Sequence, residues 1–223
     1  MKRFFGHPMT LWPSMRNRLH VYALPAPDLR SALEERQRVL EAFDYCSIQP
    51  AEYLHATVQQ FAVTSEEVSP EEIDAFMARL KSLTAETKPF SVELGEPEAD
   101  DYSLGVRGTI TSSWAKLTAA VRDAAADTIN KSHPLPGAPF NPHLTLGYAL
   151  AEGSTELIQQ ASDRLRAPAL PPLTINEVHF IAVHQDVNRG TFTWDTTSRF
   201  PFSEPQPMTG PSRQFRAMYD WSP

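Results

Sequence analysis

The sequence is poor in cysteine and glycine, and each shortage excludes a class of site. Its 223 residues include one cysteine, Cys46, and nine glycines. One cysteine excludes an internal disulfide and a zinc site built from cysteines. Because Cys46 follows Phe43 and Tyr45, we interpret it as a packed thiol rather than a nucleophile. No glycine-rich turn follows the first predicted strand, so no phosphate-cradling loop of the nucleotide-binding α/β type is visible.

The sequence also lacks a long hydrophobic run. No apolar stretch approaches the roughly 20 residues that a membrane-spanning helix needs. The first five residues are basic and then apolar, but His7, Pro8 and Pro13 interrupt them before a signal-peptide core can form. We therefore expect a cytoplasmic protein with no membrane partner.

An excess of basic residues is missing as well. The formal net charge is −7, with 20 lysines and arginines against 27 acidic residues. A surface that grips long RNA or DNA normally carries a basic excess, so this balance argues against such a grip. A small phosphate ester held in a local pocket remains compatible with it. The apolar fraction of 41% is enough for a real core in one large domain or two small lobes.

The pattern along the chain predicts strands and helices in two comparable halves. Residues 1–18 show little periodicity and are predicted to form an irregular arm. The two halves together are predicted to span residues 19–200, and the proline-rich tail 201–223 is expected to be mobile or to lie on the surface. The clearest helix signal is Ser69 followed by Pro70 and Glu72, a capping box with proline at the first helical position. Strands are predicted at 19–24, 53–62, 90–94, 102–108, 142–149, 173–184 and 191–196, and helices at 28–44, from 69, from 112 and from 154. This mixture predicts an α+β fold with two lobes, largely antiparallel sheets and outer helices.

Two short motifs carry the chemistry. His55-Ala56-Thr57-Val58 and His143-Leu144-Thr145-Leu146 both read His-x-Thr-x with an apolar fourth residue. Side chains alternate along a strand, so each histidine and its threonine point to one face and the two apolar residues point to the other. Seven histidines and 34 serines and threonines give about one such match by chance, but both copies lie in strand-like runs, one in each half. Facing strands of this kind would place two imidazoles and two hydroxyls in one cleft.

These residues resemble those of a known family, the 2H phosphoesterases, and most closely the bacterial RNA 2′,3′-cyclic phosphodiesterases, also called 2′-5′ RNA ligases. The resemblance covers roughly residues 19–185. It is strongest in Phe140-Asn141-Pro142-His143-Leu144-Thr145-Leu146-Gly147 and extends to the opening strand Leu19-His20-Val21-Tyr22-Ala23-Leu24-Pro25. The first motif departs from the family wording at Ala56 and at Gln59-Gln60, which puts the substrate in question more than the fold.

The resemblance implies a bilobal, pseudo-twofold fold with its active site in a central groove. It also implies hydrolysis of a cyclic phosphodiester to a 2′-phosphate with no metal and no cofactor. His55 and His143 would then be the catalytic acid and base, in an order that the sequence leaves open, because imidazole both takes and gives protons near neutral pH. Thr57 and Thr145 would hydrogen-bond the non-bridging phosphate oxygens.

Three further side chains are candidates for substrate contact. Phe61 and Tyr148 lie at or next to the cleft ends of their strands and would stack on a base, with core packing as the alternative for each. Arg107 ends a predicted strand and would contact phosphate, with an ordinary surface position as the alternative.

The other histidines are assigned no role in the site. His20 has no threonine two residues later, and His179 and His184 lie on a late strand where packing is the default. His7 and His133 are predicted in loops. No histidine pair has metal-ligand spacing, so no metal site is predicted.

Several functions remain open from the sequence. The leading hypothesis is a phosphodiesterase that acts on the 2′,3′-cyclic phosphate ends of RNA or on cyclic nucleotides and that works as a monomer, with reverse 2′-5′ RNA ligase activity as an open option. The same fold would also serve a 2′-5′ oligonucleotide or a small cyclic metabolite. A non-catalytic RNA- or nucleotide-binding module is the alternative from another class. Finally, the two motifs would be coincidental if the fold placed His55 and His143 far apart.

Overall fold

The computed structural model describes residues 1–6, 12–129, 135–137, 139 and 141–203. His7, His133 and most of the predicted tail, residues 204–223, lie outside this part of the chain. The strands are β1 Arg18–Ala23, β2 Ala56–Thr64, β3 Phe90–Val92, β4 Glu98–Ala99, β5 Ser103–Arg107, β6 His143–Tyr148, β7 Leu173–Ile175, β8 Glu177–Asp186 and β9 Thr191–Pro201. The helices are α1 Pro27–Gln37, α2 Pro70–Glu86, α3 Ser112–Asp127 and α4 Thr155–Arg164, with short 3₁₀ helices at Arg38–Ala42 and Ala51–Tyr53.

The local signals in the sequence explain the helices. Ser69 caps α2 by accepting from the backbone N–H of Glu72, and the Glu72 carboxylate accepts from the Ser69 backbone, so the predicted capping box is confirmed. Phe76 and Leu80 form the buried stripe of this helix. No helix in the described ranges is long and apolar enough to cross a membrane.

The strands form a seven-stranded antiparallel sheet in the order β4-β5-β6-β2-β1-β8-β9, with β3 and β7 as a separate antiparallel pair. The two motif strands, β2 and β6, are neighbours in the middle and meet at the single register pair Ala56 and Leu144. We call β2, β1, β8 and β9 the first lobe, and β6, β5 and β4 the second lobe. The predicted α+β class with antiparallel sheets is confirmed.

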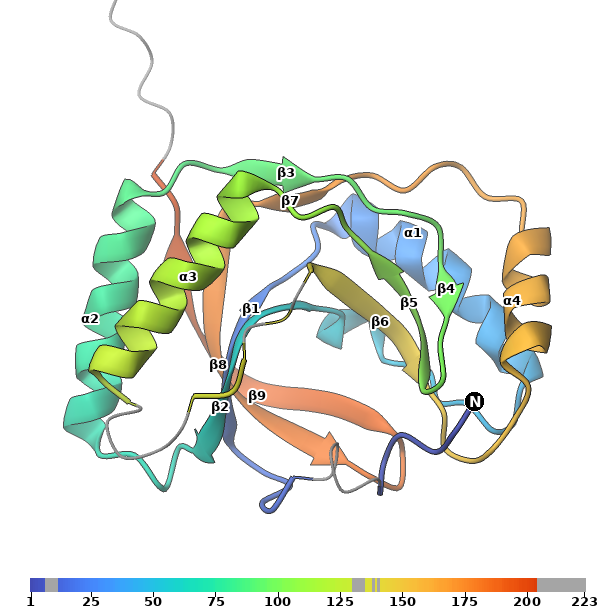
Figure 1. Ribbon diagram of the computed structural model, residues 1–223, viewed down its shortest axis with the longest axis horizontal. Helices are drawn as coiled ribbons and strands as arrows, with labels where there is room; N and C mark the ends of the chain where they lie inside the picture. Colours follow the sequence, from blue (N-terminus) through green and yellow to red (C-terminus); the bar gives the residue numbers. More distant parts are fainter. Residues whose placement is uncertain (7–11, 130–134, 138, 140, 204–223) are drawn as a thin grey trace, which may run out of the picture.

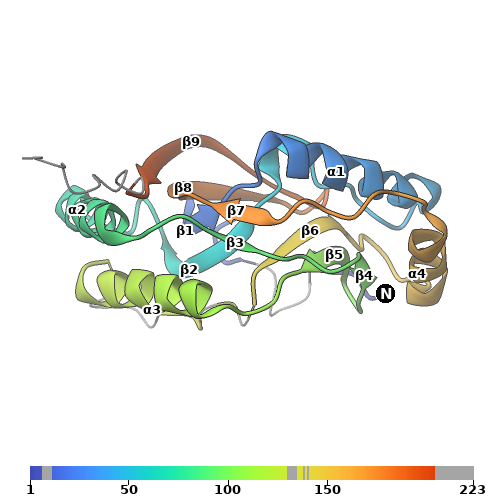
Figure 2. The same cartoon turned by 90° about the horizontal axis from the view of Figure 1, so that it is seen from above.

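The lobes are not successive halves of the chain, which differs from the simple division expected from the sequence. The long predicted strand at 173–184 divides into β7 and β8, and β8 returns to pair with β1 in the first lobe. The helices also cross between lobes, because α1 packs on β6 whereas α3 packs on β2. Figures 1 and 2 show α2 and α3 side by side at one end of the molecule and α1 and α4 at the other.

The two motif strands divide the molecule into a core face and an open face. Ala56 and Val58 of β2 are fully buried on the helix side, as are Leu144 and Leu146 of β6. The histidines and threonines of both motifs remain partly exposed on the opposite side. The alternation predicted from the sequence therefore holds across both motifs and places all four polar side chains on one face.

Each motif ends in a β-bulge, which the sequence did not predict. Val21 pairs with Gln59 but Tyr22 pairs with Thr57, which leaves Val58 as an extra residue in β2. On the other lobe, Leu104 pairs with Gly147 and Gly105 with Thr145, which leaves Leu146 extra in β6. A bulge shifts the alternation of side chains by one residue. The residues that rejoin the open face are therefore Gln60 in β2 and Tyr148 in β6, each three positions after its motif threonine.

Candidate active site

The four motif side chains line one cavity. His55 and Thr57 enter it from β2, and His143 and Thr145 enter it from β6. Its volume is about 220 Å³. The sequence placed these residues together only on the assumption that the two strands face one another, and the pairing of β2 with β6 supplies that arrangement. The hypothesis that the motifs are coincidental and far apart is therefore wrong.

Both motif histidines are held in the same way. His55 Nδ1 lies 2.8 Å from the carbonyl oxygen of Tyr53, and His143 Nδ1 lies 3.1 Å from that of Asn141. A carbonyl only accepts hydrogen bonds, so Nδ1 carries the proton in each neutral ring. Nε2 is left with a lone pair to receive a proton, or to carry the second proton when the ring is charged. The two lobes thus present matched proton-transfer atoms to one cavity.

The surroundings of His55 favour its neutral form. Tyr22 stacks on the imidazole with ring centroids 4.0 Å apart, and Trp194 meets it edge-on at 5.6 Å. Burial lowers the pKa of His55 to about 4; the hydrogen bond to the Tyr53 carbonyl opposes this shift and the charge of His143 adds to it. His55 is therefore a neutral imidazole at neutral pH, with its lone pair on Nε2, the state that a general base requires.

The structure adds His20 to the cavity, which the motif pattern did not select because no threonine follows it two residues later. Its side chain is 3% exposed, and Nδ1 lies 3.0 Å from the carbonyl oxygen of Arg18. Trp12 stacks on the ring at 5.2 Å, and burial lowers the pKa of His20 to about 3. The alternation of side chains along β1 could have indicated His20, because residues two apart on a strand share a face and both His20 and Tyr22 line the cavity. Gln60, Phe4 and Phe192 also line the cavity and were missed.

Of the two aromatic residues predicted to contact substrate, Tyr148 lies at the cavity and Phe61 does not. Tyr148 lines the cavity with 6% of its surface exposed, and burial raises its pKa to about 12, a shift that the neighbouring Thr145 side chain opposes. The expectation that Phe61 faces substrate is wrong. Its ring is fully buried and packs on Phe76 and Phe180, because the bulge at Val58 turns it into the core.

Arg107 lies at the edge of the site. It is the cross-strand neighbour of His143, and its guanidinium is 2.9 Å from the Asp100 carboxylate. Both side chains are about half exposed. Arg107 and Asp100 line a second cavity of about 360 Å³, which shares Phe4, His143, Thr145 and Tyr148 with the first. Arg107 therefore lies beside the second motif. Its contact with substrate stays a prediction.

The remaining described histidines lie outside both cavities. His179 bonds to Glu177 and Thr197, and His184 lies 3.3 Å from the Asp195 carboxylate. Within the described ranges, no group of three or more histidine, cysteine, aspartate or glutamate side chains is arranged to hold a metal ion.

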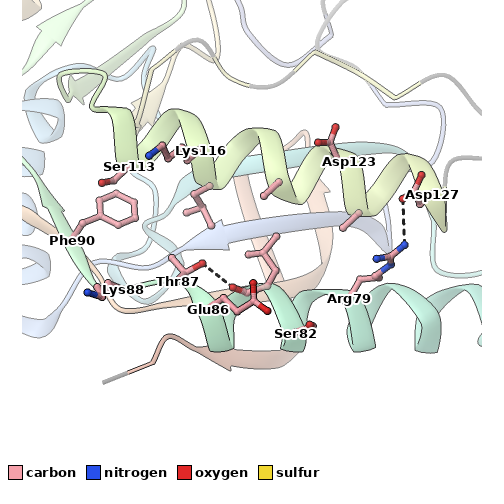
Figure 3. A pocket seen from close by; sticks show the side chains of 14 residues that line it. Arg79, Ser82, Glu86, Thr87, Lys88, Phe90, Ser113, Lys116, Asp123 and Asp127 are labelled. Atoms are coloured by element: carbon pink, nitrogen blue, oxygen red, sulfur yellow. Dashed lines mark hydrogen bonds and ion pairs between the residues drawn. The ribbon is translucent and has the colours of Figure 1, made fainter. Parts of the chain in front are cut away.

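A larger groove of about 630 Å³ lies between α2 and α3 (Figure 3). Arg79 and Asp127 form an ion pair of 3.4 Å across it, and Lys88 and Lys116 lie towards its other end. The described residues that line it include no histidine or cysteine. This groove therefore has no imidazole or thiol to exchange protons near neutral pH, and the motif cavity is the candidate active site.

Comparison with known proteins agrees with this geometry. A model of the 2′-5′ RNA ligase superfamily matches residues 25–187, and the chain belongs to that superfamily. No curated protein matches the sequence.

Solved structures show the same fold. The crystal structure of TT0787 of Thermus thermophilus superposes with a TM-score of 0.59 at 17% identity, covering 83% of this chain and 98% of its own. LigT of E. coli complexed with 3′-AMP gives a TM-score of 0.58 at 17% identity, covering 84% of this chain and 98% of its own. At these identities the likeness defines the fold alone.

Proposed function

We propose that the protein is a phosphodiesterase that opens 2′,3′-cyclic phosphates, on RNA ends or on nucleotides, to 2′-phosphates. The observation that carries this proposal is the matched pair of histidines and threonines in one cavity, each imidazole held by the carbonyl two residues before it. Membership of the 2′-5′ RNA ligase superfamily supports phosphoester chemistry. E. coli LigT, which shares the fold, was solved with 3′-AMP and with NADP⁺, which supports a nucleotide as the substrate class.

The mechanism assigns different roles to the two histidines. His55, neutral because of its burial, takes a proton from water at Nε2 as the water oxygen bonds to phosphorus. The P–O3′ bond breaks on the opposite side, and the imidazolium of His143 gives its Nε2 proton to the departing oxygen. The products are a 3′-hydroxyl and a 2′-phosphate, and proton exchange with solvent restores both rings. Thr57 and Thr145 donate to the non-bridging oxygens as their charge develops.

The first experiment measures turnover of 2′,3′-cyclic AMP, and of a short RNA with a cyclic phosphate end, in the presence of EDTA. We expect wild type to be active, and His55→Ala and His143→Ala each to lose about 10²–10⁴ in kcat. His184→Ala is the matched control, because it removes a histidine outside both cavities, and its rate should stay within about twofold of wild type. Activity that persists in either motif variant would contradict the assignment. Nucleotide binding without any turnover would instead support the non-catalytic module.

The second cavity favours one alternative substrate. It lies beside His143 and Thr145 and has a volume of about 360 Å³, so a second nucleoside has space on the far side of the phosphate. A 2′-5′-linked dinucleotide would use both cavities, whereas a terminal cyclic phosphate needs only one. Including 2′-5′ ApA and a small cyclic metabolite in the same assay, and comparing kcat/KM, decides between these substrates.

A further inference from the structure

The described parts of the N-terminal arm, residues 1–6 and 12–17, contact both lobes on the open face of the sheet. The Phe4 backbone N–H donates to the Ala149 carbonyl at 2.9 Å, and Lys2 forms a 2.9 Å ion pair with Asp101. Both contacts are on the second lobe. Further along the arm, the Trp12 backbone N–H donates to the side-chain oxygen of Gln185, on β8 of the first lobe. Figure 1 shows the arm, in dark blue, beside the end of β6 and the β8–β9 hairpin.

A buried aromatic cluster fixes the arm to this face. Phe5 is fully buried, with its ring 5.3 Å from Tyr148 and 5.5 Å from Phe192. Phe4 packs on Tyr148 at 4.6 Å. Phe4 and Phe5 therefore share a hydrophobic core with strands from both lobes, which fixes their positions at the site.

Among the described residues, the arm also supplies the partly exposed phenylalanine and tryptophan rings of the motif cavity. Tyr22, Tyr148 and Phe192 come from the sheet and are 2%, 6% and 7% exposed, so their rings are already covered. Phe4 and Trp12 come from the arm and are only half-buried. Trp12 lines only the motif cavity and not the second one. Its ring is already in contact with the Arg18 guanidinium, 4.9 Å from the ring centroid, and with the stacked His20 ring at 5.2 Å. Phe4 borders both cavities, beside the His143 and Thr145 that they share.

We propose that Phe4 is the surface on which the nucleobase of the substrate packs, so that the arm makes the enzyme selective for cyclic phosphates that carry a base. This inference rests on the proposed function and adds a specificity residue to it. Every nucleobase has a π-face, so an aromatic ring beside the phosphate site holds any base without reading its sequence. The arm precedes residues 25–187, so Phe4 lies outside the part of the chain that the superfamily model matches.

The test compares a base-carrying substrate with a base-free one. We expect Phe4→Ala to raise KM for 2′,3′-cyclic AMP roughly 5- to 150-fold, the range typical of one base–aromatic contact. Its kcat/KM for glycerol 1,2-cyclic phosphate, which has no base, should stay within about twofold of wild type. Phe4→Tyr keeps the ring and should resemble wild type. Phe90→Ala is the matched control, because Phe90 is also half-buried but lines the distant groove between α2 and α3.

Two outcomes would overturn the proposal. An equal loss on both substrates would show that Phe4 only supports packing, and no loss on either would show that the base lies elsewhere. If the melting temperature shows that Phe4→Ala does not fold, Phe4→Leu keeps the apolar contact but removes the π-face, and the same selective loss is expected.

A binding measurement separates this proposal from the proposed function. If wild type turns over neither cyclic phosphate, the proposed function fails, but calorimetric titration with 3′-AMP still tests the contact. Phe4→Ala should then bind 3′-AMP roughly 5- to 150-fold more weakly than wild type, while Phe90→Ala binds equally. Equal affinity of wild type and Phe4→Ala would reject the nucleobase contact.

Discussion

Tyr22 lies flat against His55, with ring centroids 4.0 Å apart and an interplanar angle of 16°. The tyrosine is 2% exposed, so one face of the imidazole is closed to water by a residue that is itself fixed in the core. This contact is part of the burial that keeps His55 uncharged, and it gives the candidate active site an expected pH dependence that can be measured.

The acid limb of the pH–rate profile should report His55. In free enzyme the acid limb of kcat/KM follows the pKa of the essential base. Because burial lowers the pKa of His55 to about 4, we expect kcat/KM for 2′,3′-cyclic AMP to hold down to about pH 5 and to halve near pH 4. A limb near the ordinary histidine value of about 6.5 would assign the base to another group.

Stability should fall with acid because of the same burial. The folded-state pKa values of His20 and His55 are about 3 and about 4, below the unfolded value of about 6.5. The unfolded chain therefore binds protons that the folded chain does not, so stability is full above about pH 6.5 and is lost as pH falls towards 4. At pH 5 each histidine should cost about 2 kcal/mol, measured by urea unfolding. His20→Phe should show a smaller loss between pH 7.5 and pH 5 than wild type; an unchanged loss would exclude His20 as a contributor.

Adjacent residues in β2 should separate stability from activity. Phe61→Ala removes a fully buried ring and should lower the free energy of unfolding by about 3–5 kcal/mol. Gln60→Ala removes a partly exposed side chain at the cavity and should change stability by less than about 1 kcal/mol while raising KM. Denaturant unfolding and steady-state kinetics on both variants test this pair. If Gln60→Ala lost the stability and Phe61→Ala instead raised KM, the bulge at Val58 would be misplaced.

Arg107 should matter for substrate more than for folding. Its ion pair with Asp100 is exposed, so Arg107→Ala should cost less than about 1 kcal/mol of stability. If the guanidinium also contacts phosphate, KM should rise several-fold and depend less on salt than in wild type. Arg79→Ala, which breaks the exposed pair with Asp127 in the distant groove, is the control. If KM and its salt dependence were the same for both variants, Arg107 would not contact the substrate.

Gly147 should tolerate no side chain. A Cβ there would lie 2.1 Å from the Ser47 carbonyl oxygen and 2.5 Å from Leu40, because the chain passes directly against the end of β6. Gly147→Ala should destabilise the protein by about 1–3 kcal/mol or more, seen as a lower melting temperature. Gly137→Ala is the matched control, since a Cβ at Gly137 meets no described residue within 4 Å. Similar melting temperatures for the two variants would show that the Ser47 carbonyl does not lie this close to Gly147.

The features that could be predicted from the sequence alone are those with local causes. The capping box at Ser69 predicted the start of α2 because its hydrogen bonds join residues three apart. The alternation in each motif predicted that histidine and threonine share a face, because neighbouring side chains on a strand point to opposite sides. The His-x-Thr wording also led to the correct superfamily.

The remaining features depend on contacts between segments that are distant along the chain. The pairing of β2 with β6 brings the two motifs into one cavity, and the return of β8 to β1 makes the lobes differ from the halves of the chain. The bulges at Val58 and Leu146 arise from register between paired strands, and so no pattern within β2 alone shows that Phe61 turns inward. The arm has no periodicity, and its place at the site comes from the burial of Phe5 among rings from both lobes, which is a property of the assembled core.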